Sequence, residues 1–199
     1  ESTLLSRLES FLHDSKILDN NQFAFRRGSG TDLALTEFLH TINEALDNRR
    51  VVGAVFLDVK KAYDCINHEM LANKLECAGV RGHTLKLFKN YLSGRTQAVR
   101  LGSAISEYHS IDKGVGQGAS LAPLLFNLAT NDFGKLRLSC RAVRFADDIV
   151  LFATSPANQV DAMLRGLSSD VLTAINYHKA NQMEINPTKS KFMVIHRKS

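Results

Sequence analysis

The sequence lacks several patterns by which protein classes are recognised. Its three cysteines, Cys65, Cys77 and Cys140, form no CxxC pair and leave an odd number. This arrangement offers no zinc signature and favours reduced thiols in an intracellular protein. No apolar run approaches the ~20 residues of a membrane-spanning helix, and no signal-peptide pattern is seen. We therefore expect a protein of the nucleus, the cytoplasm or both, with no membrane partner.

Common catalytic motifs are missing as well. The seven histidines do not gather into a ligand set, and His68-Glu69 lacks the second histidine of a metalloprotease helix. The sequence contains no Gly-x-Ser-x-Gly elbow and no Walker loop. Hydrolase and nucleotide-switch functions are therefore without support.

The composition is that of a globular protein with a basic excess. Hydrophobic residues make up 44% and charged residues 23% of 199 residues, and the net charge is +5. The excess lies mainly in residues 51–100 and 151–199, so a polyanionic partner is compatible with it. The central basic side chains are expected to lie partly on a nucleic-acid backbone and partly on solvated helix faces; they are Lys60, Lys61, Lys74, Lys86, Lys89, Arg95 and Arg100. The chain opens within a helical pattern at Glu1, so we expect a piece of a longer protein.

Hydrophobic periodicity indicates a mixture of helices and mostly antiparallel strands, which predicts an α+β fold. Helices are expected at 4–12, 35–46, 68–78, 83–92, 119–133 and 157–180. The expected strands are 51–58, two around Gly102-Ser103, two around Asp147-Asp148, and two within 182–196 that are broken at Asn186-Pro187.

Three carboxylates stand at strand ends. Asp147 and Asp148 interrupt the apolar stretch "VRFADDIVLFA" (143–153), and Asp58 closes "VVGAVFLD" (51–58). If these strands are neighbours in one sheet, the three side chains meet, and they cannot all stay ionised without a partner. Mg²⁺ prefers such oxygen ligands, and two ions about 3.5–4 Å apart can serve a phosphoryl transfer. The alternative is a solvated Asp-Asp turn, with Asp58 as a helix cap or an ion-pair partner.

Several ordered blocks carry a resemblance to a known family. They are "QFAFRRGSGT" (22–31), "FLDVKKAYD" (56–64), "INHEMLANKL" (66–75), "YLSGRTQAVRLG" (91–102), "GVGQGASLAPLLFN" (114–127), "FADD" (145–148) and "INPTKSKFM" (185–193). In order and spacing the sequence resembles the reverse transcriptases of non-LTR (LINE-type) retrotransposons, over essentially the whole chain. Reverse transcriptases of group II introns and retrons share the metal site but fit "INHEML" and "YLSGRTQ" less well.

The resemblance implies the fingers and palm of a right-hand polymerase, with an antiparallel palm sheet packed on helices and no thumb. Residues 1–50 would form fingers, and residues 51–199 the palm with an inserted fingers segment. The implied reaction adds deoxynucleoside triphosphates to a DNA primer on an RNA template. A thumb and an endonuclease are expected to flank this segment in the full-length protein.

The resemblance also implies roles for the carboxylates. Asp58, Asp147 and Asp148 would be catalytic ligands of two Mg²⁺ ions, for which Mn²⁺ could substitute. The backbone carbonyl of Val59 would add a further ligand. Catalysis would then rest on positioning and on neutralising phosphate charge.

Further roles carried over from the family each have a plainer alternative. Tyr63 would exclude a 2′-hydroxyl, or be a core aromatic. Gln117 would contact the nucleotide and the template. Arg26 and Arg27 would bind the triphosphate, or only a nucleic-acid backbone or solvent. Lys189 would protonate the leaving pyrophosphate, or guard a strand edge.

A few positions depart from the family pattern. Gly116 stands where proline is usual, Ala122 where serine is usual, and Phe145 where tyrosine is more common. Asp64 would support the site, or instead be an ion-pair partner or a cap before the helix that starts near Asn67. The alternative function is a catalytically inactive, nucleic-acid-binding or scaffolding remnant of a reverse transcriptase.

Overall fold

The structure, a computed structural model, describes residues 1–197, which form two compact units. The helical unit comprises residues 1–17 and 63–129, and the sheet unit comprises residues 18–62 and those from Thr130 onward. Residues 18–50 lie with the sheet, and the expected division into fingers and palm at residue 50 stays a prediction. Among the described residues, no helix is long and apolar enough to span a membrane.

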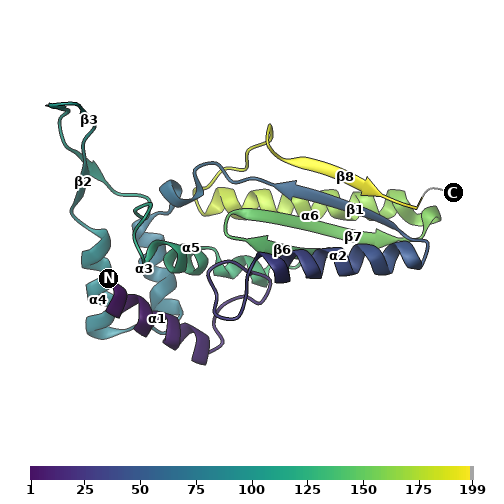
Figure 1. The fold of residues 1–199 in the computed structure, drawn as a ribbon, viewed down its shortest axis with the longest axis horizontal. Coiled ribbons are helices and arrows are strands. Elements are labelled where there is room, and N and C mark those ends of the chain that lie inside the picture. Colours follow the sequence, from purple (N-terminus) through teal and green to yellow (C-terminus); the bar gives the residue numbers. More distant parts are fainter. Residues whose placement is uncertain (198–199) are drawn as a thin grey trace. The chain divides into compact units, whose positions relative to one another are not determined.

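Each unit has its own set of elements (Figure 1). The helical unit contains α1 (Ser2–Asp14), α3 (His68–Cys77), α4 (Gly82–Leu92), α5 (Ala122–Ala129) and the short strands β2 (Arg95–Gln97), β3 (Arg100–Leu101), β4 (Ala104–Ile105) and β5 (His109–Ile111). The sheet unit contains α2 (Thr31–Asp47), β1 (Val51–Leu57), β6 (Arg141–Phe145), β7 (Asp148–Ser155), α6 (Val160–Ala180) and β8 (Lys191–Ile195). Single 3₁₀ turns cover η1 (Ala62–Cys65), η2 (Asn131–Lys135) and η3 (Ala157–Gln159).

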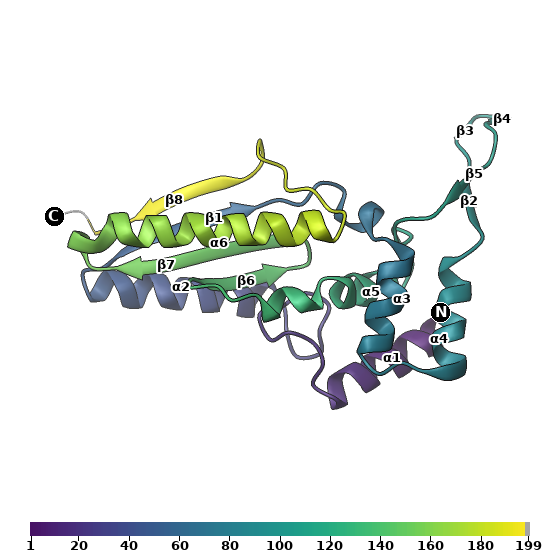
Figure 2. The same ribbon diagram turned by 180° about the vertical axis from the view of Figure 1, so that it is seen from behind.

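A four-stranded antiparallel sheet in the order β6-β7-β1-β8 forms the core of the sheet unit. Successive residues of a strand face opposite sides. Gly53 of β1 faces α6, since a Cβ there would meet side chains of that helix, and Ala54 packs in a cluster with Ala34 and Phe38 of α2. The two helices therefore cover opposite faces of the sheet, and Figure 2 shows α6 lying along one of them.

A buried arginine ties the edge of this sheet to the chain segment before α2. Arg144 of β6 is 2% exposed, and its Nη2 lies 2.8 Å from Oδ2 of Asp19. Its Nη1 donates to the carbonyl of Thr130 at 2.9 Å, and the guanidinium lies over the Phe133 ring. Burial lowers the pKa of Arg144, and the charge of Asp19 opposes that shift. A Cβ at Gly134 would collide with the Asp19 carboxylate, which accounts for glycine there.

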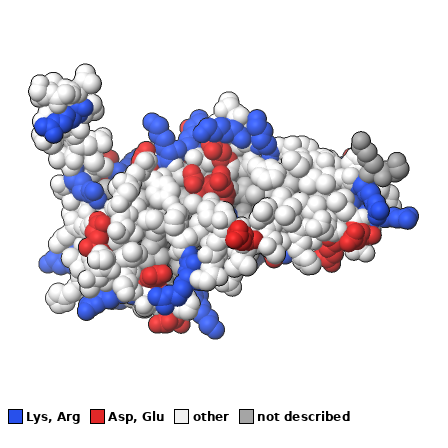
Figure 3. Space-filling model, viewed as in Figure 1, with Lys and Arg blue, Asp and Glu red and all other residues white. Residues whose placement is uncertain are grey.

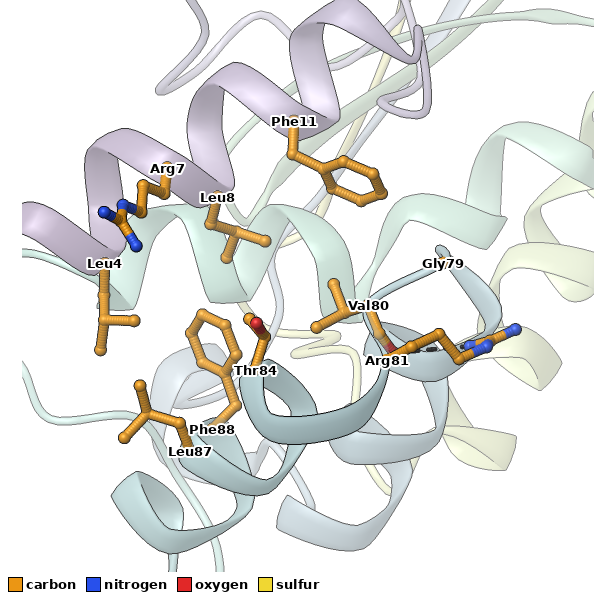
Figure 4. Close-up of a pocket in the computed structure, with 10 residues that line it drawn as sticks. All are labelled: Leu4, Arg7, Leu8, Phe11, Gly79, Val80, Arg81, Thr84, Leu87 and Phe88. Carbon is orange, nitrogen blue, oxygen red and sulfur yellow. Dashed lines mark hydrogen bonds between the residues drawn. The ribbon is translucent and has the colours of Figure 1, made fainter.

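The helical unit packs α3 against α4 and α5 and carries an apolar pocket. The pocket has a volume of about 360 Å³ and lies between α1 and the start of α4. Leu8 and Phe11 of α1 and Phe88 of α4 line it, as Figure 4 shows. Because no residue proposed for catalysis lines it, this pocket is not the candidate active site.

Most expected elements are confirmed, and three differ. The helix expected over 119–133 is α-helical only over Ala122–Ala129 and continues as the 3₁₀ turn η2. The hairpin at Gly102-Ser103 is present, although its outer parts pair separately as β2 with β5. Of the two strands expected within 182–196, one forms, β8, while the earlier part makes an isolated bridge from Ile185 to Val59.

Candidate active site

The register of the sheet brings Asp58 and Asp148 together. Leu57 pairs with Ile149, the last pair of the β1–β7 ladder toward this end of the sheet. Asp58 follows Leu57, and Asp148 precedes Ile149. In an antiparallel pair of strands, the residue that follows one member of a pair lies opposite the residue that precedes its partner. The two carboxylates, 90 positions apart in the sequence, therefore share one end of the sheet.

Asp147 joins them through a tight turn. Phe145 pairs with Asp148, so Ala146 and Asp147 are the two turn residues of the β6–β7 hairpin. Burial raises the pKa of Asp148, and the negative charges of Asp147 and Asp58 raise it further. Asp148 thus lies within electrostatic range of both other carboxylates, which is the condition expected of a cation site.

The backbone of Asp58 is held by the segment before β8. Its carbonyl accepts from the amide of Asn186 at 2.7 Å, and its own amide donates to Ser190 Oγ at 3.4 Å. The amide of Lys60 donates to the carbonyl of Glu184 at 2.8 Å. Val59 forms a bridge with Ile185 whose hydrogen bonds are made by the residues on either side of Val59. The carbonyl of Val59 therefore points away from Ile185, to the side of β1 on which β7 lies.

Lys189 lies beside the carboxylate of Asp58. Its Nζ is 3.9 Å from Asp58 Oδ1, and the lysine side chain is 71% exposed against 30% for the aspartate. Asn186 shapes this loop, because its side-chain oxygen accepts from the amide and the hydroxyl of Thr188. A cationic ammonium group is therefore present at the same end of the sheet as the acidic side chains.

The donor set fits a divalent cation by its chemistry. Carboxylate oxygens and a backbone carbonyl are the ligands of Mg²⁺ and Mn²⁺. Figure 3 shows acidic side chains gathered on this face at the hairpin end of the sheet, with basic side chains beside them. Within residues 1–197 no three His, Cys, Asp or Glu side chains are grouped as ligands of one ion.

The two arginines of the Gly-rich loop have different surroundings. Arg26 is half-buried, and its Nη1 donates to the carbonyls of Asp19 and Gln22 at 2.6 and 3.1 Å, while Nη2 donates to Asn20. Arg27 is exposed. Arg26 therefore shapes its own loop, and Arg27 offers the more accessible guanidinium for an anionic ligand.

Tyr63 and Gln117 belong to the helical unit, where their segments lie together. The Tyr63 ring stacks on Phe126 of α5 with ring centroids 4.6 Å apart, and its carbonyl accepts from the amide of Val115 at 2.9 Å. Gln117 is exposed, and its Nε2 donates to Oδ1 of Asp64 at 3.2 Å. Asp64 thus contacts Gln117, while Asn67 caps α3 by accepting from Met70.

Two basic residues of the central block contact other side chains of this protein. Lys60 forms an ion pair with Glu184 at 2.6 Å, and Arg95 lies over the Tyr91 ring. These two members of the central basic block therefore have partners within the chain. A Cβ at Gly116 would come within 3.2 Å of the Arg95 guanidinium, so glycine there allows a close approach.

The sequence analysis gave no role to two polar residues that are buried near the site. Gln22 and Arg144, both 2% exposed, meet at the edge of the sheet through the parallel bridge that pairs their backbones. A signal was present for Arg144, because an arginine between apolar residues of a strand requires a partner when it is buried. No comparable signal marked Gln22 within "QFAFRR".

Comparison with known proteins places the chain in a family. Residues 1–198 match the family model "Reverse transcriptase (RNA-dependent DNA polymerase)", and the chain belongs to that family. It is 34% identical over 157 residues to the "Probable RNA-directed DNA polymerase from transposon X-element" of Drosophila melanogaster, which covers 75% of this chain and 17% of the relative. It is 29% identical to the corresponding protein of transposon BS from the same organism, over 96% of this chain and 21% of the relative.

The relatives are thus polymerases of non-LTR retrotransposons, which confirms the family expected from the sequence. The chain spans about a fifth of the length of these relatives.

Solved structures share the fold at low sequence identity. Apo telomerase from Candida tropicalis, truncated from its C-terminal domain, superposes with a TM-score of 0.69 at 15% identity over 100% of this chain and 41% of that chain. Telomerase of the same species in complex with a fragment of telomeric RNA gives a TM-score of 0.67 at 13% identity, over 97% of this chain and 33% of that chain. The expected α+β fold of polymerase fingers and palm is confirmed.

Proposed function

We propose that this chain is the catalytic segment of an RNA-directed DNA polymerase, which adds deoxynucleotides to a primer 3′ end by two-metal phosphoryl transfer. The observation that carries the proposal is the β1–β7 register, which sets Asp58 across from Asp148 beside the Asp147 turn. Membership of the reverse transcriptase family supports the same chemistry. The length of the curated relatives supports a place within a longer retrotransposon polyprotein.

The carboxylates of Asp58, Asp147 and Asp148 and the carbonyl of Val59 would hold the ions. When bound, two divalent cations activate the primer hydroxyl and neutralise the triphosphate. The chain's residues otherwise position the reactants, because phosphoryl transfer needs orientation and charge neutralisation more than covalent chemistry. Lys189, 3.9 Å from Asp58, carries a proton that it can give to the leaving pyrophosphate.

The remaining family roles belong to the same proposal. Tyr63, stacked on Phe126, would discriminate against ribonucleotides, and Gln117 would contact the nucleotide and the template. Arg27 would bind the triphosphate, with Arg26 shaping the loop that presents it. The partners would be an RNA template, a DNA primer and deoxynucleoside triphosphates.

The test is primer extension on a primed homopolymer RNA with Mg²⁺ and deoxynucleotides. The Asp147→Asn, Asp148→Asn double variant should lose extension, while Asp161→Asn, an exposed aspartate in the first turn of α6, should retain it. Binding of Mn²⁺, counted by electron paramagnetic resonance without nucleic acid, gives a second readout. A wild-type chain that binds no Mn²⁺ and extends no primer would overturn the proposal in favour of an inactive remnant.

A further inference from the structure

The edge of the sheet next to the acidic turn is completed by a segment from the other end of the sequence. Strand β6 is the outermost strand on its side of the sheet. The amide of Phe23 donates to the carbonyl of Arg144 at 2.9 Å, and the amide of Arg144 donates to the carbonyl of Asn21 at 2.8 Å. These bonds form a parallel bridge centred on Gln22. The segment is therefore fixed against the strand that leads into the turn.

The side chain of Gln22 extends this pairing beyond the bridge. Its Oε1 accepts from the amide of Ala146 at 2.9 Å, and its Nε2 donates to the carbonyl of Ala146 at 3.1 Å. The same oxygen accepts from the amide of Ala24 at 3.1 Å. Gln22 thus binds both polar backbone groups of one residue, as a paired strand would. It is 2% exposed, so water competes little for these bonds.

Ala146 has a backbone conformation that needs such support. Its φ is 54°, in the left-handed region that residues with a Cβ seldom adopt. In a two-residue hairpin, a positive φ at the first turn position usually selects glycine. Here alanine occupies that position, and Gln22 holds it from outside the hairpin. The next residue is Asp147, and Asp148 begins β7, so the conformation of Ala146 sets the direction in which both carboxylates leave the turn.

We propose that Gln22 is a positioning residue of the polymerase site: its amide holds Ala146 in the left-handed conformation that directs Asp147 and Asp148 toward Asp58. The inference rests on the proposed function, because it concerns the same carboxylates. Gln22 itself touches neither substrate nor ion. It acts only through the turn, as outer residues that orient metal ligands do.

The primary variant is Gln22→Met, which keeps the length of the side chain and removes all three hydrogen bonds. Asp170→Asn is the matched control, because buried Asp170 accepts from Ser139 and Cys140 just before β6 and so fixes the opposite end of the same strand. Mn²⁺ binding by the whole chain is measured by electron paramagnetic resonance, and exchange of the Ala146 amide proton is followed by NMR. Both are measured well below the unfolding temperature of each variant.

Gln22→Met should weaken Mn²⁺ binding about tenfold to a hundredfold and accelerate exchange at Ala146, while Asp170→Asn leaves both near wild type. Adding Ala146→Gly to Gln22→Met should recover part of the binding, because glycine adopts the turn without support. If Gln22→Met does not fold, the double variant with Ala146→Gly is compared with Ala146→Gly alone, and its Mn²⁺ binding should be weaker but by a smaller factor.

Two results would overturn the inference without touching the proposed function: Mn²⁺ binding that Gln22→Met leaves unchanged, or equal losses in Gln22→Met and Asp170→Asn. Absence of Mn²⁺ binding in the wild type would instead overturn the proposed function itself.

Discussion

Removing one partner of the buried ion pair between Arg144 and Asp19 should strongly destabilise the sheet unit. Asp19→Asn removes the charge that faces a guanidinium only 2% exposed, while the aspartate side chain itself is 11% exposed. Breaking a buried pair by removing one partner costs about 3–5 kcal/mol, and because asparagine can still accept one hydrogen bond we expect about 3 kcal/mol. With a urea m-value of about 2 kcal/mol/M, the unfolding midpoint falls by about 1.5 M.

The assay must report on the sheet unit alone, because a chain of two units need not unfold in one step. Urea-dependent hydrogen exchange of amides in β1 and β7 meets this need. The control is an exposed ion pair between Arg141 of the same strand and Glu37 of α2, and Glu37→Gln should cost less than about 1 kcal/mol.

A double-mutant cycle isolates the interaction. The double variant Arg144→Met, Asp19→Asn should cost less than the sum of the two single changes, because it leaves no buried charge unpaired. The expected coupling is about 2 kcal/mol. A cost for Asp19→Asn as small as that for Glu37→Gln, or additive losses in the cycle, would refute the argument from burial.

Three further outcomes can be measured. Burial acts to raise the pKa of Asp170, but hydrogen bonds from Ser139 and Cys140 lower that pKa below its usual 3.8. The contribution of Asp170 to stability is therefore present above pH 3.8 and is lost as the pH falls through the lowered pKa, so the stability difference between wild type and Asp170→Asn should shrink on acidification below about pH 4. A constant difference in urea titrations would contradict this. Burial, and to a smaller extent the hydrogen bond and the charge of Asp170, raises the pKa of Cys140 from 9.0 to about 12, which lowers its thiolate fraction about a thousandfold. Iodoacetamide at pH 8 should therefore modify exposed Cys77 before Cys140, and equal labelling of the two by mass spectrometry would count against this. Lys189→Ala should slow single-nucleotide addition by about 10²-fold or more, with Lys189→Arg intermediate; an unchanged rate would exclude the proton transfer.

The expectations that came from hydrophobic pattern and turn chemistry are confirmed in the sheet unit. The apolar run before Asp58 is strand β1, and Asp147 lies in the β6–β7 turn with Asp148 at the start of β7. These features depend on neighbouring residues, so periodicity was sufficient to predict them. The assignment of catalytic, metal and substrate roles to individual residues stays a prediction, resting on the family and on the convergence of the carboxylates.

Expectations that depended on distant packing were less complete. The assignment of residues 1–50 to the fingers stays a prediction, and α2 within that range covers a face of the sheet. A triphosphate-binding role for Arg26 also stays a prediction, and its guanidinium is bonded to its own loop. A second strand before β8 forms only a bridge, because the Asn186-Pro187 turn interrupts the pairing.

The sequence by itself determined the family, the order of most elements and the three aspartates, because ordered blocks and periodic apolar residues are local properties that can be read along the chain. Tertiary structure alone decided that Asp58 lies across from Asp148, that Asp19 neutralises Arg144, and that Gln22 holds Ala146. Each of these joins residues at least 90 positions apart in the sequence. Their pairing follows from strand register and from the need of buried polar groups for partners, and no local pattern along the chain encodes either.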